Sequence, residues 1–210
     1  PNAYLRVAAG GVLIPALNRL GVSIGTHIRR CAKIDDRAFG SLESDIALLN
    51  AAMFPVLDES AGARMAEAIL NAKAECDSVG GITETAVCGL PAGLGEPWFD
   101  SVEGLLSHAL FSLGGVKGVE FGEGFAIADA RGSEANDPFR ICDGKIVTTT
   151  NHNGGVNGGI TNGMPILFRC AVKPTPSIAR EQQTVDFLSG ENVSLTIAGR
   201  HDPAIVHRIC

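Results

Sequence analysis

The stretch Pro165-Ile166-Leu167-Phe168-Arg169-Cys170-Ala171-Val172, followed at once by Lys173-Pro174-Thr175-Pro176-Ser177, decides the fold. Its apolar residues recur at every even position from Ile166 to Val172, which is the period of a strand with one buried face. The two prolines then fix their backbone angles and disfavour a continued strand. We therefore predict a strand over 165–172 that leads into a rigid polar turn.

Helices and further strands surround this strand in the sequence. Apolar residues at helical spacing predict helices over 4–20, 58–77 and 100–113, the last starting at a capping box of Asp100 and Glu103. Strands are expected near 22–34, 82–88, 146–150 and 193–198, with two short strands over 116–129. Most of the expected strands follow one another at the spacing of hairpins, which favours an antiparallel α+β fold over a doubly wound parallel sheet.

Length and composition predict one globular domain over 1–210. A chain of 210 residues with 45% hydrophobic residues can bury a sizeable core. The net charge of −6 and the absence of a basic run exclude a general nucleic-acid or anionic-membrane surface. No apolar run is long enough to cross a bilayer, so we expect a cytoplasmic protein.

The six cysteines are scattered, and no pair has C-x-x-C spacing. This pattern favours reduced thiols over a disulfide framework and predicts no metal site. The first residue is not Met, and the chain stops at Ile209-Cys210 within an apolar stretch. We therefore expect that the chain is truncated at both ends.

A glycine-rich segment covers Asn151–Gly163 and contains five glycines and four asparagines. Such a segment lets the backbone approach another group closely. A bulged hairpin or tight crossover would also explain it, but the composition favours a ligand-binding loop. It lacks the Gly-Lys-Ser/Thr of a Walker A loop and the Gly-x-Gly-x-x-Gly of a Rossmann turn.

Two more segments carry polar groups that suit a phosphorylated ligand. The turn 173–177 holds an ammonium and two hydroxyls close together, although an ordinary strand-ending turn would have the same prolines. Arg200-His201-Asp202 offers an anion clamp, an imidazole and a carboxylate, against the alternative of a surface ion pair. We expect both segments to meet the glycine-rich loop around one ligand.

These motifs together resemble the chorismate synthase family, and the resemblance runs through nearly the whole chain. The stretches that carry it are Arg6–Gly10, Asp77–Gly81, Leu90–Pro97, Val116–Gly122, Gly132-Ser133, Asn136-Asp137, Asn151, Gly154–Ile160, Lys173–Ser177 and Gly199–Pro203. By resemblance, the fold has helices packed between antiparallel β-sheets, in a β-α-β sandwich, and the protein is a homotetramer.

The resemblance implies a lyase of the shikimate pathway, which leads to the aromatic amino acids. The family converts 5-enolpyruvylshikimate 3-phosphate to chorismate and phosphate by a 1,4-anti elimination. This reaction needs reduced FMN although no net redox change occurs, and NADPH is the candidate reductant in bifunctional relatives. The substrate is therefore expected to be a small anionic molecule.

The resemblance also implies which residues bind the flavin. FMN would be held by Gly158, by Lys173, Pro174, Thr175, Pro176 and Ser177, by Arg200, and by the backbone of Gly114 and Gly115, where relatives carry a pair such as Asn-Ala. Asp202 matches the aspartate near the flavin N5 edge, so its expected role is catalytic, in proton handling.

Some family motifs have no counterpart in this chain. The early Gly-x-Ser-His-Gly-type motif, a second catalytic histidine and an Arg-Ser-Ser-x-Arg-Glu-Thr stretch would all precede Arg6, and a helix would follow Arg208. An alternative to the enzyme is therefore a truncated, non-catalytic relative that binds flavin or only assembles. A generic phosphate-binding module would explain the glycine-rich loop but not the other motifs.

Overall fold

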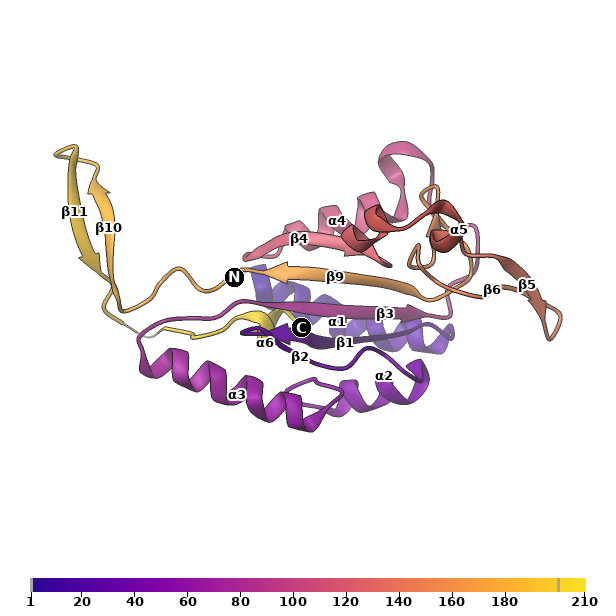
Figure 1. The fold of residues 1–210 in the computed structure, drawn as a ribbon, viewed down its shortest axis with the longest axis horizontal. Helices are drawn as coiled ribbons and strands as arrows, with labels where there is room; N and C mark the ends of the chain where they lie inside the picture. Colours follow the sequence, from indigo (N-terminus) through magenta and orange to yellow (C-terminus); the bar gives the residue numbers. More distant parts are fainter. Residues whose placement is uncertain (1, 200) are drawn as a thin grey trace.

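The computed structural model describes residues 2–199 and 201–210 and centres on a five-stranded antiparallel sheet (Figure 1). The strand order is β2-β1-β3-β9-β4, with bounds Ile34–Asp35, Ser23–Cys31, Gly81–Cys88, Ile166–Val172 and Val116–Phe121. The predicted strand over 165–172 is β9, and it pairs with β3 on one side and β4 on the other. The α+β class is confirmed.

One face of the sheet is apolar and packs on helices. Phe168 and Cys170 of β9 are buried on this face, where they meet helix α4, Val102–Phe111. A second cluster joins Ile28 and Val172 to Met65 of helix α3, Glu59–Ala74, and to Val206 of the short helix α6, Val206–Ile209. The even-numbered residues of β9 thus all lie in the core, with Val172 in one cluster and the others in the second, as their spacing predicts.

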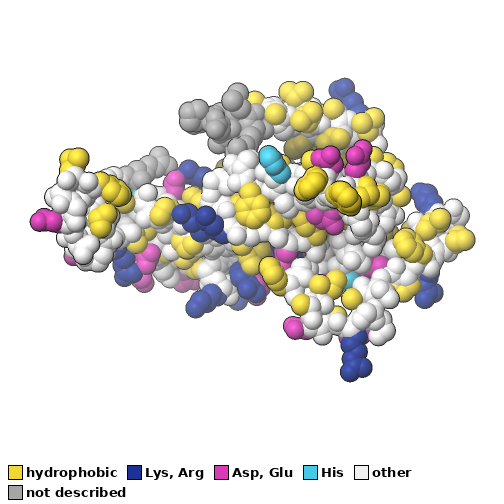
Figure 2. Space-filling view, turned by 90° about the horizontal axis from the view of Figure 1, so that it is seen from above, with side chains coloured by type: hydrophobic (Ala, Val, Ile, Leu, Met, Phe, Trp, Pro, Cys, Tyr) yellow, Lys and Arg dark blue, Asp and Glu magenta, His cyan; other side chains and the backbone are white. Residues whose placement is uncertain are grey.

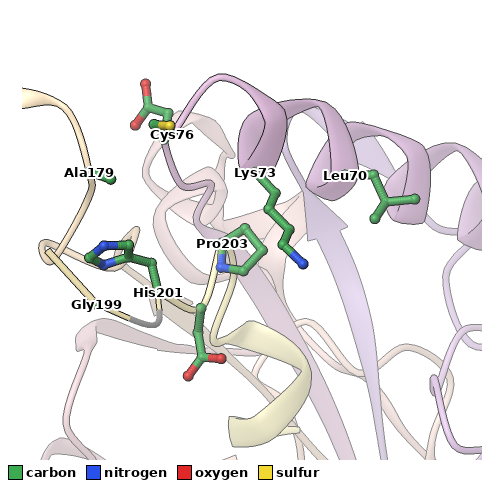
Figure 3. Close-up of a pocket in the computed structure, with 9 residues that line it drawn as sticks. Leu70, Lys73, Cys76, Ala179, Gly199, His201 and Pro203 are labelled. Carbon is green, nitrogen blue, oxygen red and sulfur yellow. The ribbon is translucent and has the colours of Figure 1, made fainter.

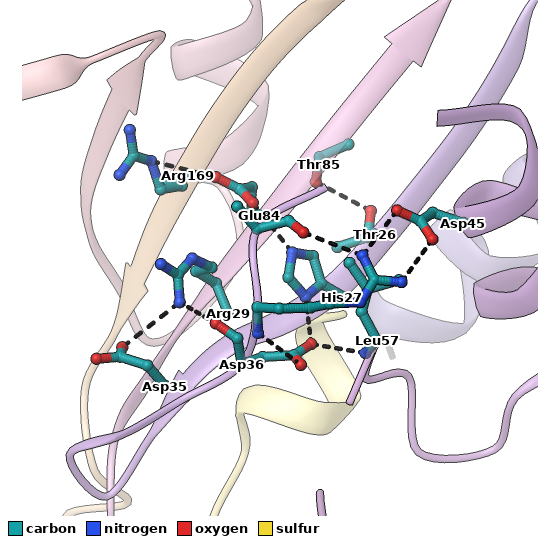
Figure 4. A network of polar contacts seen from close by, with 12 residues as sticks. Thr26, His27, Arg29, Asp35, Asp36, Asp45, Leu57, Glu84, Thr85 and Arg169 are labelled. Atoms are coloured by element: carbon teal, nitrogen blue, oxygen red, sulfur yellow. Dashed lines mark hydrogen bonds and ion pairs between the residues drawn. The ribbon is translucent and has the colours of Figure 1, made fainter. Parts of the chain in front are cut away.

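The opposite face carries a row of charged residues across four strands (Figure 4). His27, Glu84, Arg169 and Glu120 are partners in register on β1, β3, β9 and β4. Arg169 Nε lies 3.6 Å from Glu84 and 3.2 Å from Glu120, and His27 Nε2 lies 3.0 Å from Glu84. Glu84 and Glu120 each lie beside the Arg169 guanidinium, which offsets the cost of removing these charges from water.

Asp36 ends this row and ties a connecting loop to the sheet. Its carboxylate lies 2.7 Å from Nδ1 of the fully buried His27 and accepts backbone N–H bonds from Leu57 and Asp58 at 2.7 and 2.8 Å. Asp58 is the N-cap of α3, because its side chain accepts from the Ser60 N–H. The charged row therefore fixes where α3 begins.

The long helices largely agree with the sequence predictions, whereas the short helices α5, Gly132–Ala135, and α6 were not predicted. Helix α1, Asn2–Arg19, and α3 were expected, whereas α2, Leu42–Ala51, was not. The predicted capping box of Asp100 and Glu103 is wrong, because Ser101 caps α4 by accepting the Gly104 N–H at 2.9 Å. Asp100 instead ends the 3-10 turn η1, Trp98–Asp100.

Three hairpins complete the fold. They are β5–β6 (Phe139–Cys142 and Lys145–Thr148), β7–β8 (Val156–Asn157 and Ile160–Thr161) and β10–β11 (Glu181–Asp186 and Glu191–Thr196). The β5–β6 and β10–β11 hairpins project from opposite ends of the sheet (Figure 1). The second strand expected within 116–129 is wrong, since 3-10 turn η2, Gly124–Asp129, follows β4 and precedes α5, Gly132–Ala135.

All six cysteines are unpaired. No helix among the described residues is long and apolar enough to cross a membrane.

The packing of α3 on the sheet gives a direct test of this core. Met65→Ala should lower the free energy of unfolding by about 3 kcal/mol, because the fully buried side chain leaves a cavity. Met53→Ala is the control, since Met53 is fully exposed, and it should change stability by less than about 0.5 kcal/mol. Urea denaturation measures both, and equal effects would contradict the assigned core.

Candidate functional site

The turn after β9 meets two other segments at one end of the sheet. The Lys173 N–H donates to the Gly115 carbonyl at 2.9 Å. The Ser78 hydroxyl donates to the Thr175 carbonyl at 2.7 Å, and the Val79 N–H donates to the Pro203 carbonyl at 2.8 Å. These bonds bring together the turn 173–177, the Gly114-Gly115 pair and the segment containing Asp202. Two of the three segments that were expected to meet, the turn and the segment with Asp202, therefore do so.

Gly115 needs to be glycine in this fold. Its φ of +100° lies in the left-handed region, and a Cβ there would stand 2.7 Å from Cδ1 of Ile205. Gly114 has open space where a side chain would be. The pair thus presents free backbone beside the turn, and Gly115 supports Ile205 just after the segment with Asp202.

A cavity of about 460 Å³ opens beside this junction (Figure 3). Lys73 and Leu70 reach it from α3, whereas His201, Asp202 and Pro203 reach it from the C-terminal segment. Asp77 also lines it and is paired with Arg180 at 2.6 Å. Asp202 is paired with Arg208, and Lys73 forms no ion pair within the described part of the chain.

Several buried polar atoms of the turn 173–177 and the C-terminal segment have no partner among the described residues. They are Oγ1 of Thr175 and both ring nitrogens of His201. Buried polar atoms in proteins are nearly always hydrogen-bonded, so unsatisfied atoms are available to a ligand. A hydroxyl in the turn and an imidazole in the cavity wall therefore fit a polar, phosphorylated molecule better than an apolar one.

The glycine-rich loop does not join the other two segments within one chain. It precedes β9, whereas the turn 173–177 follows it, and the seven residues of β9 span roughly 20 Å. Figure 1 shows the loop near β5–β6 and the turn near β10–β11. Gly158 thus lies at the far end of the sheet, and Arg200 lies outside the described residues.

Asp137 holds the start of the glycine-rich loop, a role that the sequence analysis did not assign. Its carboxylate is almost fully buried and accepts hydrogen bonds from the N–H groups of His152 and Asn153, the Asn153 amide and the Thr150 hydroxyl, at 2.7 to 2.9 Å. Burial alone would raise the pKa of Asp137, but these hydrogen bonds outweigh it and lower the pKa to about 2.

Comparison with known proteins identifies the family. A model described as chorismate synthase matches residues 2–210. The chain belongs to the chorismate synthase family.

Two curated relatives named chorismate synthase are each 46% identical to the chain, from Korarchaeum cryptofilum over 203 residues and Methanosarcina acetivorans over 206. These alignments cover 95% and 97% of this chain but 55% and 56% of the relatives, so the chain spans about half their length. A crystal structure of chorismate synthase superposes with a TM-score of 0.76 and 29% identity, covering 83% of this chain and 56% of that chain.

The hydrogen bonds that Asp137 accepts from Thr150, His152 and Asn153 predict that the protein loses stability at low pH. The folded pKa lies below the unfolded value near 4, so the contribution is complete above pH ~4 and disappears as the pH falls towards 2. Asp137→Asn should therefore lower the free energy of unfolding at pH 7 by about 2 kcal/mol. Denaturation at pH 7 and pH 3 measures this difference.

The exposed turn residue Asp143 offers the matched control. Asp143→Asn should change stability by less than about 0.5 kcal/mol at either pH. This role of Asp137 would be refuted if Asp137→Asn lowered the free energy of unfolding by the same amount at pH 3 as at pH 7.

Proposed function

We propose that the complete protein is a chorismate synthase, an FMN-dependent lyase that eliminates phosphate from 5-enolpyruvylshikimate 3-phosphate to form chorismate. Membership of the family supports the reaction class. The observation that carries the proposal is that the turn 173–177, Gly114-Gly115 and the segment with Asp202 meet at one end of the sheet, where Asp202 lines a cavity. NADPH as the flavin reductant and a cytoplasmic location belong to the same proposal.

The residues at this junction fit a flavin mononucleotide. Thr175 brings a buried hydroxyl with no partner among the described residues, Lys173 brings an ammonium, and Gly114 leaves its backbone open. Pro174 and Pro176 hold the turn in one conformation, which lowers the entropic cost of binding. Reduced FMN, when bound, supplies electron density that amino-acid side chains lack.

Asp202 is the residue that we assign to proton handling near the flavin N5 edge. Asp202 lines the same cavity as Lys73 and His201. A substrate that carries phosphate and carboxylates would find in the same wall the Lys73 ammonium, which forms no ion pair with another described residue. The elimination removes a proton as well as phosphate, and a positioned carboxylate can accept or relay that proton.

The reaction itself is tested with the full-length protein, reduced FMN and the shikimate phosphate substrate under anaerobic conditions. Wild type should release phosphate and chorismate in equal amounts. Asp202→Asn should lower kcat by at least about 100-fold, as expected for loss of a proton-transfer group, and change the Kd for FMN less than about threefold. Parallel losses in kcat and FMN affinity would refute the proton role. FMN binding without turnover by wild type would favour the non-catalytic relative.

The Thr175 hydroxyl, for which the described residues offer no partner, makes a second prediction. Thr175→Val should weaken FMN binding about fivefold to tenfold, because a hydrogen bond to the ligand is lost. The variant should not lower the melting temperature, since the hydroxyl forms no hydrogen bond in the part of the free protein that the structure describes. Thr149→Val, at an exposed hydroxyl, is the control. Flavin fluorescence titration measures the affinity, and unchanged binding would remove Thr175 from the site.

We also propose that the protein is a homotetramer in which the projecting β10–β11 hairpin is covered by another copy. Phe187 and Leu188 at its tip are 93% and 99% exposed. Figure 2 shows hydrophobic side chains gathered at this end of the molecule (left). A lone two-stranded hairpin is marginally stable in water, so contact with another surface would stabilise it.

The hairpin tip predicts a loss of assembly on mutation. The double variant Phe187→Ser/Leu188→Ser should shift the sedimentation coefficient from that of a tetramer to that of smaller species, because the apolar contact is lost. Met53→Ser, at a fully exposed position on the body, is the control. A wild-type protein that sediments as a monomer would overturn the proposed tetramer.

A further inference from the structure

An arginine six residues after Asp202, Arg208, contacts the Asp202 carboxylate. Arg208 Nη1 lies 2.9 Å from Asp202 Oδ2, and Arg208 Nη2 lies 2.9 Å from Asp202 Oδ1. The first contact is an ion pair and the second a hydrogen bond, and contacts to both oxygens fix a carboxylate in orientation as well as position. Both oxygens of Asp202 are therefore held by one guanidinium.

The pair stands between two cavities. Asp202 lines the cavity that contains Lys73 and His201, whereas Arg208 lines a second cavity of about 460 Å³ with Leu113 and Gly114. Arg208 is not among the residues that line the cavity of Asp202. The guanidinium thus supports the carboxylate from the side of the second cavity, which Gly114 also lines.

The local sequence explains why Arg208 is placed this way. Ala204 and Val206 are completely buried, and they anchor the segment in the core beside Met65. Helix α6 then turns the chain, with the Arg208 N–H donating to the Ile205 carbonyl at 3.0 Å. Ile205 rests on Gly115, so the backbone that carries Arg208 is fixed on both sides.

We propose that Arg208 is a positioning residue for Asp202: its guanidinium holds the carboxylate in one orientation at the edge of the cavity that Asp202 lines. The inference rests on the proposed function, in which Asp202 handles a proton. Proton transfer requires the carboxylate within hydrogen-bond distance of the reacting atom, so a small rotation lowers turnover. Lysine has the same charge but no fork, and it cannot hold both oxygens.

A simple surface ion pair is the competing interpretation. The side chains of Asp202 and Arg208 are 33% and 54% exposed, and exposed pairs contribute little to stability. The two interpretations differ in their effect on catalysis. A surface pair predicts unchanged turnover in a lysine variant, whereas a positioning role predicts a loss that exists only while Asp202 is present.

A double-mutant cycle in the full-length protein separates them. Arg208→Lys should lower kcat at least about tenfold, with the substrate KM and the FMN Kd within about twofold of wild type. In the Asp202→Asn background, Arg208→Lys should lower kcat no further. Arg30→Lys is the matched control, because Arg30 also contacts both carboxylate oxygens of an aspartate, Asp35, at 2.5 and 3.0 Å, on the exposed edge at β2. It should leave kcat unchanged.

A second readout needs no activity. Nitrogen NMR of the free protein should show separate, slowly exchanging Nη1 and Nη2 signals for Arg208, because both are held by Asp202. These signals should merge in Asp202→Asn. An additive cycle, an unaffected kcat in Arg208→Lys, or freely rotating Arg208 in wild type would each overturn the inference. Absence of turnover in wild type would instead refute the proposed function and leave the NMR test to decide the role of Arg208.

Discussion

The pairing of β9 with both β3 and β4 is the constraint on which the rest of the structure depends. Gly81–Val87 pair with one side of β9, and Val116–Phe121 pair with the other. The strand ends at Val172, so this register places Lys173 beside Gly115. It also places the even-numbered residues of β9 in the core and Arg169 among the carboxylates of the opposite face. A shift of one residue would exchange these two faces.

Arg169 also connects the sheet to the glycine-rich loop. Its guanidinium donates to the Gly122 carbonyl, and the N–H of the next residue, Glu123, donates to the His152 carbonyl. Gly122 has no room for a side chain, because a Cβ would stand against the backbone of His152. The charged row therefore fixes the loop at one end of β9, while the prolines fix the turn at the other. The glycine-rich loop and the turn 173–177 are therefore held in place by different interactions.

The residues that could be predicted are those whose pattern is local. Alternation predicted β9, helical spacing predicted α1 and α3, and the prolines predicted the turn after Val172. The pairing of Arg208 with Asp202 could not be predicted, because it depends on how Ala204 and Val206 enter the core. The role of Asp137 could not be predicted either, because its partners lie about fifteen residues later in the chain. The only signal in the sequence is that an aspartate in a loop often accepts hydrogen bonds from backbone N–H groups. The cap of α4 was misplaced by one residue, since Asp100 and Ser101 are both good caps.

The central claim is that the turn after β9, the glycine pair before β4 and the C-terminal segment form one flavin site. Amide chemical-shift mapping of the full-length protein during titration with reduced FMN tests it most directly. The account predicts saturable shifts at residues 113–116, 172–178 and 201–205, with none in the exposed β5–β6 hairpin. Shifts that leave all three segments unchanged, while FMN binds elsewhere, would contradict it.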